Sequence, residues 1–228
     1  MRRARALIAV AVSYLLLLMP VTGTPVAIGT VTAATGARVG ATVASSGSTV
    51  FGGDHLSTEN TGSIQIRAGA ARLLLSGASS ASLAQVDGAP AARLLSGTAV
   101  FSTANAKAFV LQAATAEIRP ESNQPTVAQV TYVSEKELRV RSTRGSLSIT
   151  VDGETQIMPE ATAYRVILDP GSYYAAENAQ GPRGSGSRQG GPPLKAGKSH
   201  FLLIAIIITS VATGVALYEA LQSPDAPK

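Results

Sequence analysis

The chain has 228 residues, of which 45% are hydrophobic and only 4% aromatic, and it contains neither tryptophan nor cysteine. The lack of cysteine excludes disulfides, thiol nucleophiles, cysteine-ligated metal sites and the lipid-modified cysteine of a lipoprotein anchor. The net charge of +5 arises from basic residues near the two ends, while the middle of the chain is close to neutral, so a nucleic-acid-binding surface is also excluded.

Residues 1–27 have the pattern of a secretory signal peptide. Three arginines within the first five residues precede the apolar run ALIAVAVSYLLLLMP, which ends at Pro20 and is followed by small residues. We expect cleavage after Gly23 or after Ala27. The alternative is that the segment is retained as an N-terminal anchor, because the apolar run is nearly long enough to cross a thin bilayer.

Residues 28–177 are predicted to be all-β, with many short strands in a β-sandwich or a β-roll. Runs of β-forming residues are separated by Gly, Asn, Asp and Pro, and in SLSITV (146–151) apolar and polar residues alternate with the period of a half-buried strand. The pair Asp152-Gly153 lies between two such runs and predicts a hairpin. We divide this body into residues 28–120 and residues 121–177, the second completing or extending the first.

A short internal repeat leaves the architecture open. The motif AARLLLSG, which ends at Gly77, recurs as AARLLSG, which ends at Gly97, 20 residues later. This spacing is typical of a stacked coil of strands, as in a β-roll. Two successive hairpins of a β-sandwich would produce the same spacing.

Three short motifs mark residues 26–86. They are a Gly-x-Val strand, a Gly-Asp-x-Leu-x-Thr segment and Gly/Ser-spaced strands that end in a hairpin, and the matching residues are Gly29, Val31, Gly53, Asp54, Leu56, Thr58, Ser63, Ile64, Ile66, Gly77, Ser79 and Leu83. With these motifs the segment resembles the FecR-like domain, the periplasmic sensor domain of iron-dicitrate regulators, and the resemblance extends loosely to residue 117. It implies an extracytoplasmic FecR-like β-domain over residues 28–120 that senses or scaffolds rather than catalyses.

The C-terminal part is predicted to attach this domain to a membrane. Residues 178–200 are rich in Gly, Pro and Ser and should form a linker, residues 201–218 (FLLIAIIITSVATGVALY) contain no charge and should form a transmembrane helix, and residues 219–228 are a short tail. Four basic linker residues are candidate contacts for anionic lipid, the alternative being a merely solvated linker: Arg183, Arg188, Lys195 and Lys198.

The expected topology has the main domain in the periplasm and a single C-terminal span in the bacterial cell membrane. The basic flank before the span would by itself favour a cytoplasmic position, but a long translocated domain can override this local charge bias. The regulators that the domain resembles place a cytoplasmic segment acting on a sigma factor before their span. Here an export signal comes first, so we expect a stand-alone domain tethered by its C-terminus.

Asp54-His55 is the acid–histidine pair that suggests chemistry. Neighbouring residues of a strand point to opposite faces, so these two side chains cannot easily bind one ligand together. A zinc site would need three or four ligands, and the second histidine, His200, lies next to the predicted span. We therefore expect Asp54 to close a turn after the Gly pair, and we expect no catalytic residue, no metal and no cofactor.

Arg139, Arg141 and Arg144 alternate along one predicted strand. Such a strip can bind an anionic glycan or lipid, and the alternative is a solvent-exposed face paired with acids of the neighbouring strand. The leading hypothesis is a non-enzymatic protein that binds, senses or scaffolds at the envelope, with membrane lipid as its partner and an envelope protein or glycan as further candidates. The rival hypothesis is a regulator that signals across the membrane to a cytoplasmic partner.

Overall fold

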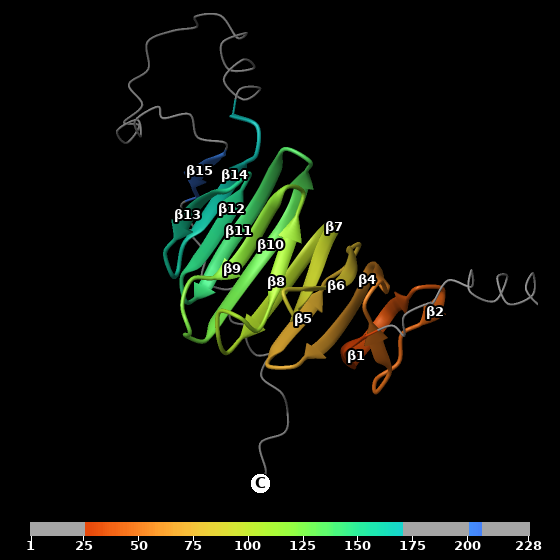
Figure 1. Cartoon of the computed structure of the whole chain (residues 1–228). Helices are drawn as coiled ribbons and strands as arrows, with labels where there is room; N and C mark the ends of the chain where they lie inside the picture. Colours follow the sequence, from red (N-terminus) through yellow and green to blue (C-terminus); the bar gives the residue numbers. More distant parts are fainter. Residues whose placement is uncertain (1–25, 171–200, 207–228) are drawn as a thin grey trace, which may run out of the picture.

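The computed structural model describes residues 26–170 and 201–206, and the elements within these ranges are β-strands (Figure 1). They are β1 (Ala27–Val39), β2 (Thr42–Val43), β3 (Thr49–Phe51), β4 (His55–Ala68), β5 (Ala71–Leu75), β6 (Ser80–Val86), β7 (Ala89–Thr103), β8 (Val110–Ala113), β9 (Ala116–Pro120), β10 (Thr126–Ser134), β11 (Glu137–Arg144), β12 (Leu147–Val151), β13 (Glu154–Met158), β14 (Ala163–Ile167) and β15 (Leu202–Ala205). The prediction of an all-β body is confirmed.

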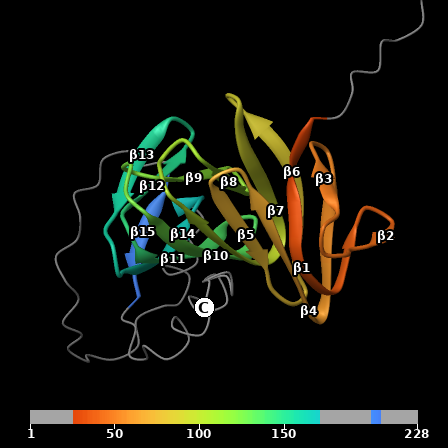
Figure 2. The same ribbon diagram turned by 90° about the horizontal axis from the view of Figure 1, so that it is seen from below.

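Hydrogen bonds join these strands into one sheet, which is antiparallel except for the parallel pair β7 and β8. The sheet folds back on itself into two layers (Figure 2). The first layer contains β6, β8, β9, β12 and β13, and the second contains β5, β10, β11, β14 and β15. The long strands β4 and β7 contribute one half to each layer.

The bend between the layers is visible in the pairing of the long strands. In β7, residues 89–96 pair with β6, whereas residues 97–103 pair with β10. In β4, residues 55–57 pair with β6, whereas residues 64–68 pair with β5. Each strand therefore changes partners part of the way along, and this change folds a single sheet into two packed layers.

Glycines allow the backbones to approach closely at this bend. A Cβ atom on Gly62 of β4 would lie 2.2 Å from the carbonyl oxygen of Gly36 in β1. A Cβ atom on Gly97 of β7, where φ is +78°, would lie 2.3 Å from Oγ of Ser79. Both halves of the internal repeat end here, at Gly77 and Gly97, so the repeat marks two strand segments that reach the same bend and does not mark stacked coils.

The core lies between the two layers and consists largely of Val, Leu, Ile and Ala. Phe101, Phe109 and Phe201 are its largest fully buried side chains, and the rings of Phe101 and Phe109 have centroids 5.7 Å apart. The second layer also carries a small separate apolar cluster on its outer side, formed by Val100 and Val127 with Leu74 packed against them. These three aromatic rings therefore fill space between the layers.

The start of the predicted transmembrane helix has a different conformation from the one expected. Residues 202–205 form β15, an edge strand antiparallel to β14, and Phe201 is fully buried in the core. The strand forms because the outer edge of β14 has unpaired backbone groups and because the core accepts the Phe201 ring. Within residues 26–170 and 201–206 there is no helix long and apolar enough to cross a bilayer.

The remaining terminal predictions lie outside the described residues. These are the signal segment up to residue 25, the linker over residues 178–200, residues 207–218 of the apolar run and the tail over residues 219–228. The four linker cations belong to this group: Arg183, Arg188, Lys195 and Lys198. Ala27, the last residue of the predicted signal segment, is the first residue of β1.

Candidate functional site

The Gly-x-Val motif lies where β1 meets β4. A Cβ atom on Gly29 would lie 2.2 Å from the carbonyl oxygen of Arg67 in β4, so a larger residue would push the two strands apart. Val31 is buried in the core, as is Leu56 of the second motif. These three motif residues hold the sheet together and present no reactive group.

Asp54 closes the turn between β3 and β4. Its Oδ2 accepts a hydrogen bond of 2.8 Å from the N–H of Phe51, and Gly53 before it has a φ of +93°. The N–H of Gly53 donates to Leu83 of β6, and the N–H of Leu83 donates back to the carbonyl oxygen of Asp54. The Asp54 side chain therefore stabilises the backbone of this turn, and the backbone hydrogen bonds to Leu83 attach the turn to the first layer.

Thr58 connects three strands at the bend. Its Oγ1 donates to the carbonyl oxygen of Ser76 at 2.8 Å and accepts from the N–H of Ser79 at 2.9 Å. Oγ of Ser79 in turn accepts from the N–H of Thr98 in β7. Two hydroxyl groups thus satisfy backbone groups where the regular strand pairing is interrupted.

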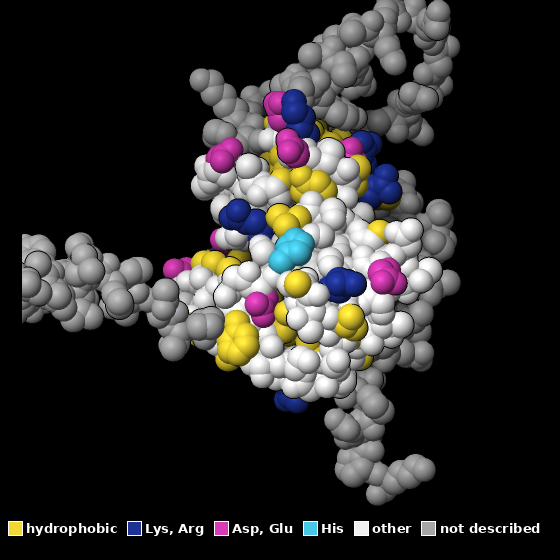
Figure 3. Space-filling view, turned by 90° about the vertical axis from the view of Figure 1, so that its right-hand side faces the viewer, with side chains coloured by type: hydrophobic (Ala, Val, Ile, Leu, Met, Phe, Trp, Pro, Cys, Tyr) yellow, Lys and Arg dark blue, Asp and Glu magenta, His cyan; other side chains and the backbone are white. Residues whose placement is uncertain are grey.

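His55 is exposed on the surface that Figure 3 shows, where the histidine is cyan. Its Nε2 lies 3.2 Å from Oγ of Ser80, and this is a contact within the outer side of the first layer. No group of three or more His, Cys, Asp or Glu side chains in the described residues is arranged to hold a metal ion. The second histidine, His200, lies outside those residues.

The outer side of the second layer brings together arginines from four strands. Arg139 of β11 lies directly opposite Arg165 of β14, and Arg67 of β4 lies directly opposite Arg72 of β5. We define the arginine face as these four residues with Arg141 and Arg144 of β11, so it contains Arg67, Arg72, Arg139, Arg141, Arg144 and Arg165. The sequence pointed to the β11 arginines alone.

Charge is distributed unevenly over the described residues. They contain 11 basic and 11 acidic residues, so the described part is neutral as a whole. Six of the 11 basic residues lie on the arginine face, whereas Glu137 is the one acidic residue at an outward strand position of that layer within the described ranges. The surface is therefore positive on one side, although the composition is balanced.

Glu137 is bound to Arg165. Two nitrogens of Arg165 donate to the two carboxylate oxygens of Glu137, both at 2.9 Å. The hydrogen bond from Arg165 and the charges of Arg165 and Arg139 lower the pKa of Glu137, although burial acts in the opposite direction. The carboxylate of Glu137 thus neutralises Arg165.

Like charges directly opposite each other repel across an antiparallel pair, and Glu137 relieves this repulsion where Arg139 faces Arg165. The face extends from β4 to β14 across five strand spacings of about 4.8 Å, which is about 24 Å. The apolar cluster of Leu74, Val100 and Val127 lies between the two arginine pairs. A broad sheet surface with separated guanidinium groups fits an extended anionic surface better than a single small anion.

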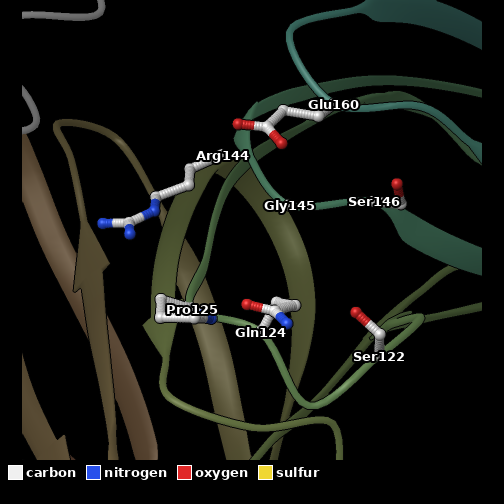
Figure 4. A pocket seen from close by; sticks show the side chains of 7 residues that line it. All are labelled: Ser122, Gln124, Pro125, Arg144, Gly145, Ser146 and Glu160. Atoms are coloured by element: carbon white, nitrogen blue, oxygen red, sulfur yellow. The ribbon is translucent and has the colours of Figure 1, made fainter.

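A polar pocket of about 380 Å³ opens at one end of β11 (Figure 4). It is lined by Ser122, Gln124, Pro125, Arg144, Gly145, Ser146 and Glu160. The loop before β10, the turn between β11 and β12, and the turn before β14 supply these residues. Arg144 and Glu160 bring opposite charges to the pocket, and its lining contains no histidine that could activate a serine.

Three arginines of the face were not singled out from the sequence. Arg67, Arg72 and Arg165 each lie between apolar residues in the runs SIQIRA, ARLLL and AYRVIL, which is the position of an outward side chain. The alternation therefore shows that each of these side chains lies on the face of its strand that points away from the core. The strand order is needed to show that they share a face with Arg139 and Arg141.

Taken together, the fold and the surface define an all-β domain with a bent two-layer sheet and one basic sheet face. No protein-family model and no curated protein matches this chain. Among solved structures, two crystal structures described as a putative anti-sigma factor from Parabacteroides distasonis are similar, at 11% sequence identity and a TM-score of 0.42. The alignments cover 50% of this chain and 54% of that chain, so this chain spans about half the length of the matched protein.

Proposed function

We propose that this protein is a membrane-attached, non-catalytic domain of the FecR-like type at the bacterial envelope, and that it binds anionic lipid headgroups through the arginine face. The observation that carries the proposal is the concentration of six arginines on one side of a neutral β-body. Each basic residue held near an anionic membrane surface contributes about 1 kcal/mol of attraction. An adjacent lipid surface would also offset the repulsion within the opposed arginine pairs.

The position of β15 supports lipid as the partner. Ile204 lies directly opposite Arg165, so the apolar run that begins at Phe201 starts at the rim of the arginine face. When the domain first approaches a membrane, the arginine face and this apolar segment therefore meet the lipid surface together. The predicted signal peptide is consistent with attachment on the outer side of the cell membrane, and the basic linker residues, such as Lys195 and Lys198, are candidate contacts for the same anionic headgroups.

The absence of a catalytic role is part of the proposal. Within the described residues, the exposed His55 has Ser80 as its hydrogen-bond partner and the lining of the polar pocket contains no histidine. A protein of this kind acts by holding a surface or a partner in place. If the full chain showed an envelope-related activity that His55→Ala abolished without loss of folding, the proposal of a non-catalytic protein would be wrong.

A site-specific probe tests lipid contact. The chain contains no cysteine, so Ser102→Cys carries a single fluorophore on the arginine face, opposite Arg72, and Ser148→Cys carries the same fluorophore on the outer side of the first layer. In vesicles with anionic lipid, a headgroup-located quencher should reduce the emission of the label at position 102 and leave that at position 148 unchanged. The effect should be lost in zwitterionic vesicles.

Charge variants provide the matched control. Arg67→Gln combined with Arg139→Gln should abolish the quenching at position 102, while the exposed Arg38→Gln and Arg93→Gln, which lie outside the arginine face, should leave it intact. Equal quenching at both labelled positions, or insensitivity to lipid charge, would contradict the proposal. If a soluble anionic glycan changed the emission of the label at position 102 and vesicles did not, the partner would be a glycan instead.

The rival function is signalling across the membrane to a cytoplasmic partner. Crosslinking of residues 219–228 to a cytoplasmic protein would support it. A reporter fused after about residue 175 tests the topology that both hypotheses require, because it should be active only if that position has been exported. A reporter that stays inactive at this position, as it would in the cytoplasm, would contradict both hypotheses.

A further inference from the structure

The strand β15 comes from a distant part of the chain and completes the sheet. It begins 35 residues after the last residue of β14, yet its four residues pair in register with residues 164–167 of that strand. A further hydrogen bond, from the N–H of Ile206 to the carbonyl oxygen of Ala163, extends the pairing. Without β15, this side of β14 would be an open sheet edge.

Phe201 fixes the strand between the two layers. Its side chain is fully buried in the main core, and its carbonyl oxygen accepts a hydrogen bond of 3.3 Å from Nε2 of Gln156 in β13. Leu203 also packs against the core. Since β13 ends the first layer and β14 would otherwise end the second, Phe201 closes the gap between the two edges.

The composition of β15 is unusual for an edge strand in water. Edge strands are normally protected by charged residues or proline, but residues 201–206 (FLLIAI) are apolar at every position. Leu202, Leu203 and Ile204 are only partly buried, and Ala205 is exposed. A strand with no polar side is suited to a second environment in which all of its side chains are covered.

The lengths show that the strand and a full membrane span cannot coexist. Residues 201–218 are 18 uncharged, mostly apolar residues and would form a helix of about 27 Å, close to the hydrocarbon thickness of about 30 Å. With residues 201–205 in the strand, the 13 residues 206–218 remain, and a helix of that length is about 20 Å long. Residues 201–205 are therefore needed both for the strand and for a helix long enough to span the membrane.

We infer that the edge of β14 is a strand-binding site which residues 201–205 occupy in the lipid-free protein and leave when they enter the bilayer. The inference rests on the proposed membrane attachment. Departure of β15 uncovers the backbone groups of residues 164–167 and empties the position of the Phe201 ring. Such an edge, beside an apolar slot, is the feature by which sheets take up an extended segment of another protein.

A cysteine pair reports directly on β15. The hydrogen bond between Ile206 and Ala163 makes their positions a hydrogen-bonded pair, so the adjacent pair Tyr164 and Ala205 is of the non-hydrogen-bonded kind, with Cα atoms about 4.5 Å apart. This separation is within the range of a disulfide. The full chain carrying Tyr164→Cys and Ala205→Cys is synthesised with and without anionic vesicles, floated, and treated with a mild oxidant.

The control pair is Thr150→Cys with Thr155→Cys, whose native hydroxyl oxygens are 2.8 Å apart in the β12–β13 hairpin, which does not pair with β15. We expect both pairs to form intramolecular disulfides in the lipid-free chain. In the vesicle-bound chain, only the control pair should do so. A chain oxidised before vesicles are added should remain extractable by alkaline carbonate, and a reduced chain should not.

The outcomes separate this inference from the proposed function. A chain that does not float with vesicles contradicts membrane attachment and removes the inference with it. A floated chain that still forms the 164–205 disulfide contradicts the inference alone, as does a lipid-free chain that forms no disulfide or forms only disulfide-linked dimers. If Tyr164→Cys disturbs folding, Val166→Cys with Leu203→Cys provides a second pair of the same kind.

Discussion

At the scale of single residues, the bend depends on a threonine hydroxyl. Thr58→Val keeps the side-chain shape but removes the acceptor of the Ser79 N–H and the donor to Ser76. Because a buried N–H is left unpaired, we expect a loss of about 1–3 kcal/mol in the free energy of unfolding. Chemical denaturation of the lipid-free chain measures this loss. Thr32→Val removes one exposed hydrogen bond to Gln65 and should change stability by less than about 0.5 kcal/mol.

A second residue-scale prediction concerns Gly29. Its missing side chain leaves room for the carbonyl oxygen of Arg67, so Gly29→Ala must displace one of two paired strands. We expect destabilisation of about 1–3 kcal/mol, seen as a lower melting temperature. Gly52→Ala is the matched control, because a Cβ atom there would lie 3.8 Å from its nearest neighbour. Equal effects of the two substitutions would show that the close approach does not matter.

At the scale of elements, the ion pair between β11 and β14 makes stability depend on pH. Arg165 lowers the pKa of Glu137 below its ordinary value of 4.5, so the folded state favours the carboxylate. The stabilisation is therefore present above about pH 4.5 and is lost as the pH falls through the lower pKa of the folded state. It should be less than about 1 kcal/mol, since the Arg165 side chain is 37% exposed.

The comparison of the native chain with Glu137→Gln measures this contribution. The two unfolding free energies should differ at neutral pH and converge at a pH well below 4.5. A difference that stays constant over this range would mean that Glu137 contributes through packing or hydrogen bonding and not through its charge.

Most strands were predictable from the sequence because each carries its signal locally. The alternation in SLSITV corresponds to β12 (Leu147–Val151), and Asp152-Gly153, with φ values of +50° and +83°, forms the hairpin to β13. The length of β7 was not predictable in this way. Its two halves bury residues in different layers, and the interruption at Gly97 looks in the sequence like the end of a strand.

At the scale of the whole molecule, Phe201 tests whether β15 completes the core. Phe201→Ala should lower the free energy of unfolding of the lipid-free chain by about 3–5 kcal/mol, because a fully buried ring is replaced by a cavity. Phe51→Ala removes the same atoms from a residue that is 36% exposed and should cost less than half as much. Similar losses for both variants would show that β15 adds little to the fold.

Local patterns in the sequence determined the all-β class, the hairpin at Asp152-Gly153 and the positions of several outward arginines, because strand period and turn chemistry act over a few residues. The tertiary structure decided how a single sheet folds into two layers, and that Arg67 and Arg72 share a face with Arg139 and Arg165. It also decided that the apolar run begins as a strand. An apolar segment is compatible with a bilayer, a core or a sheet edge, and only the open edge of β14 and the space for the Phe201 ring select the last of these.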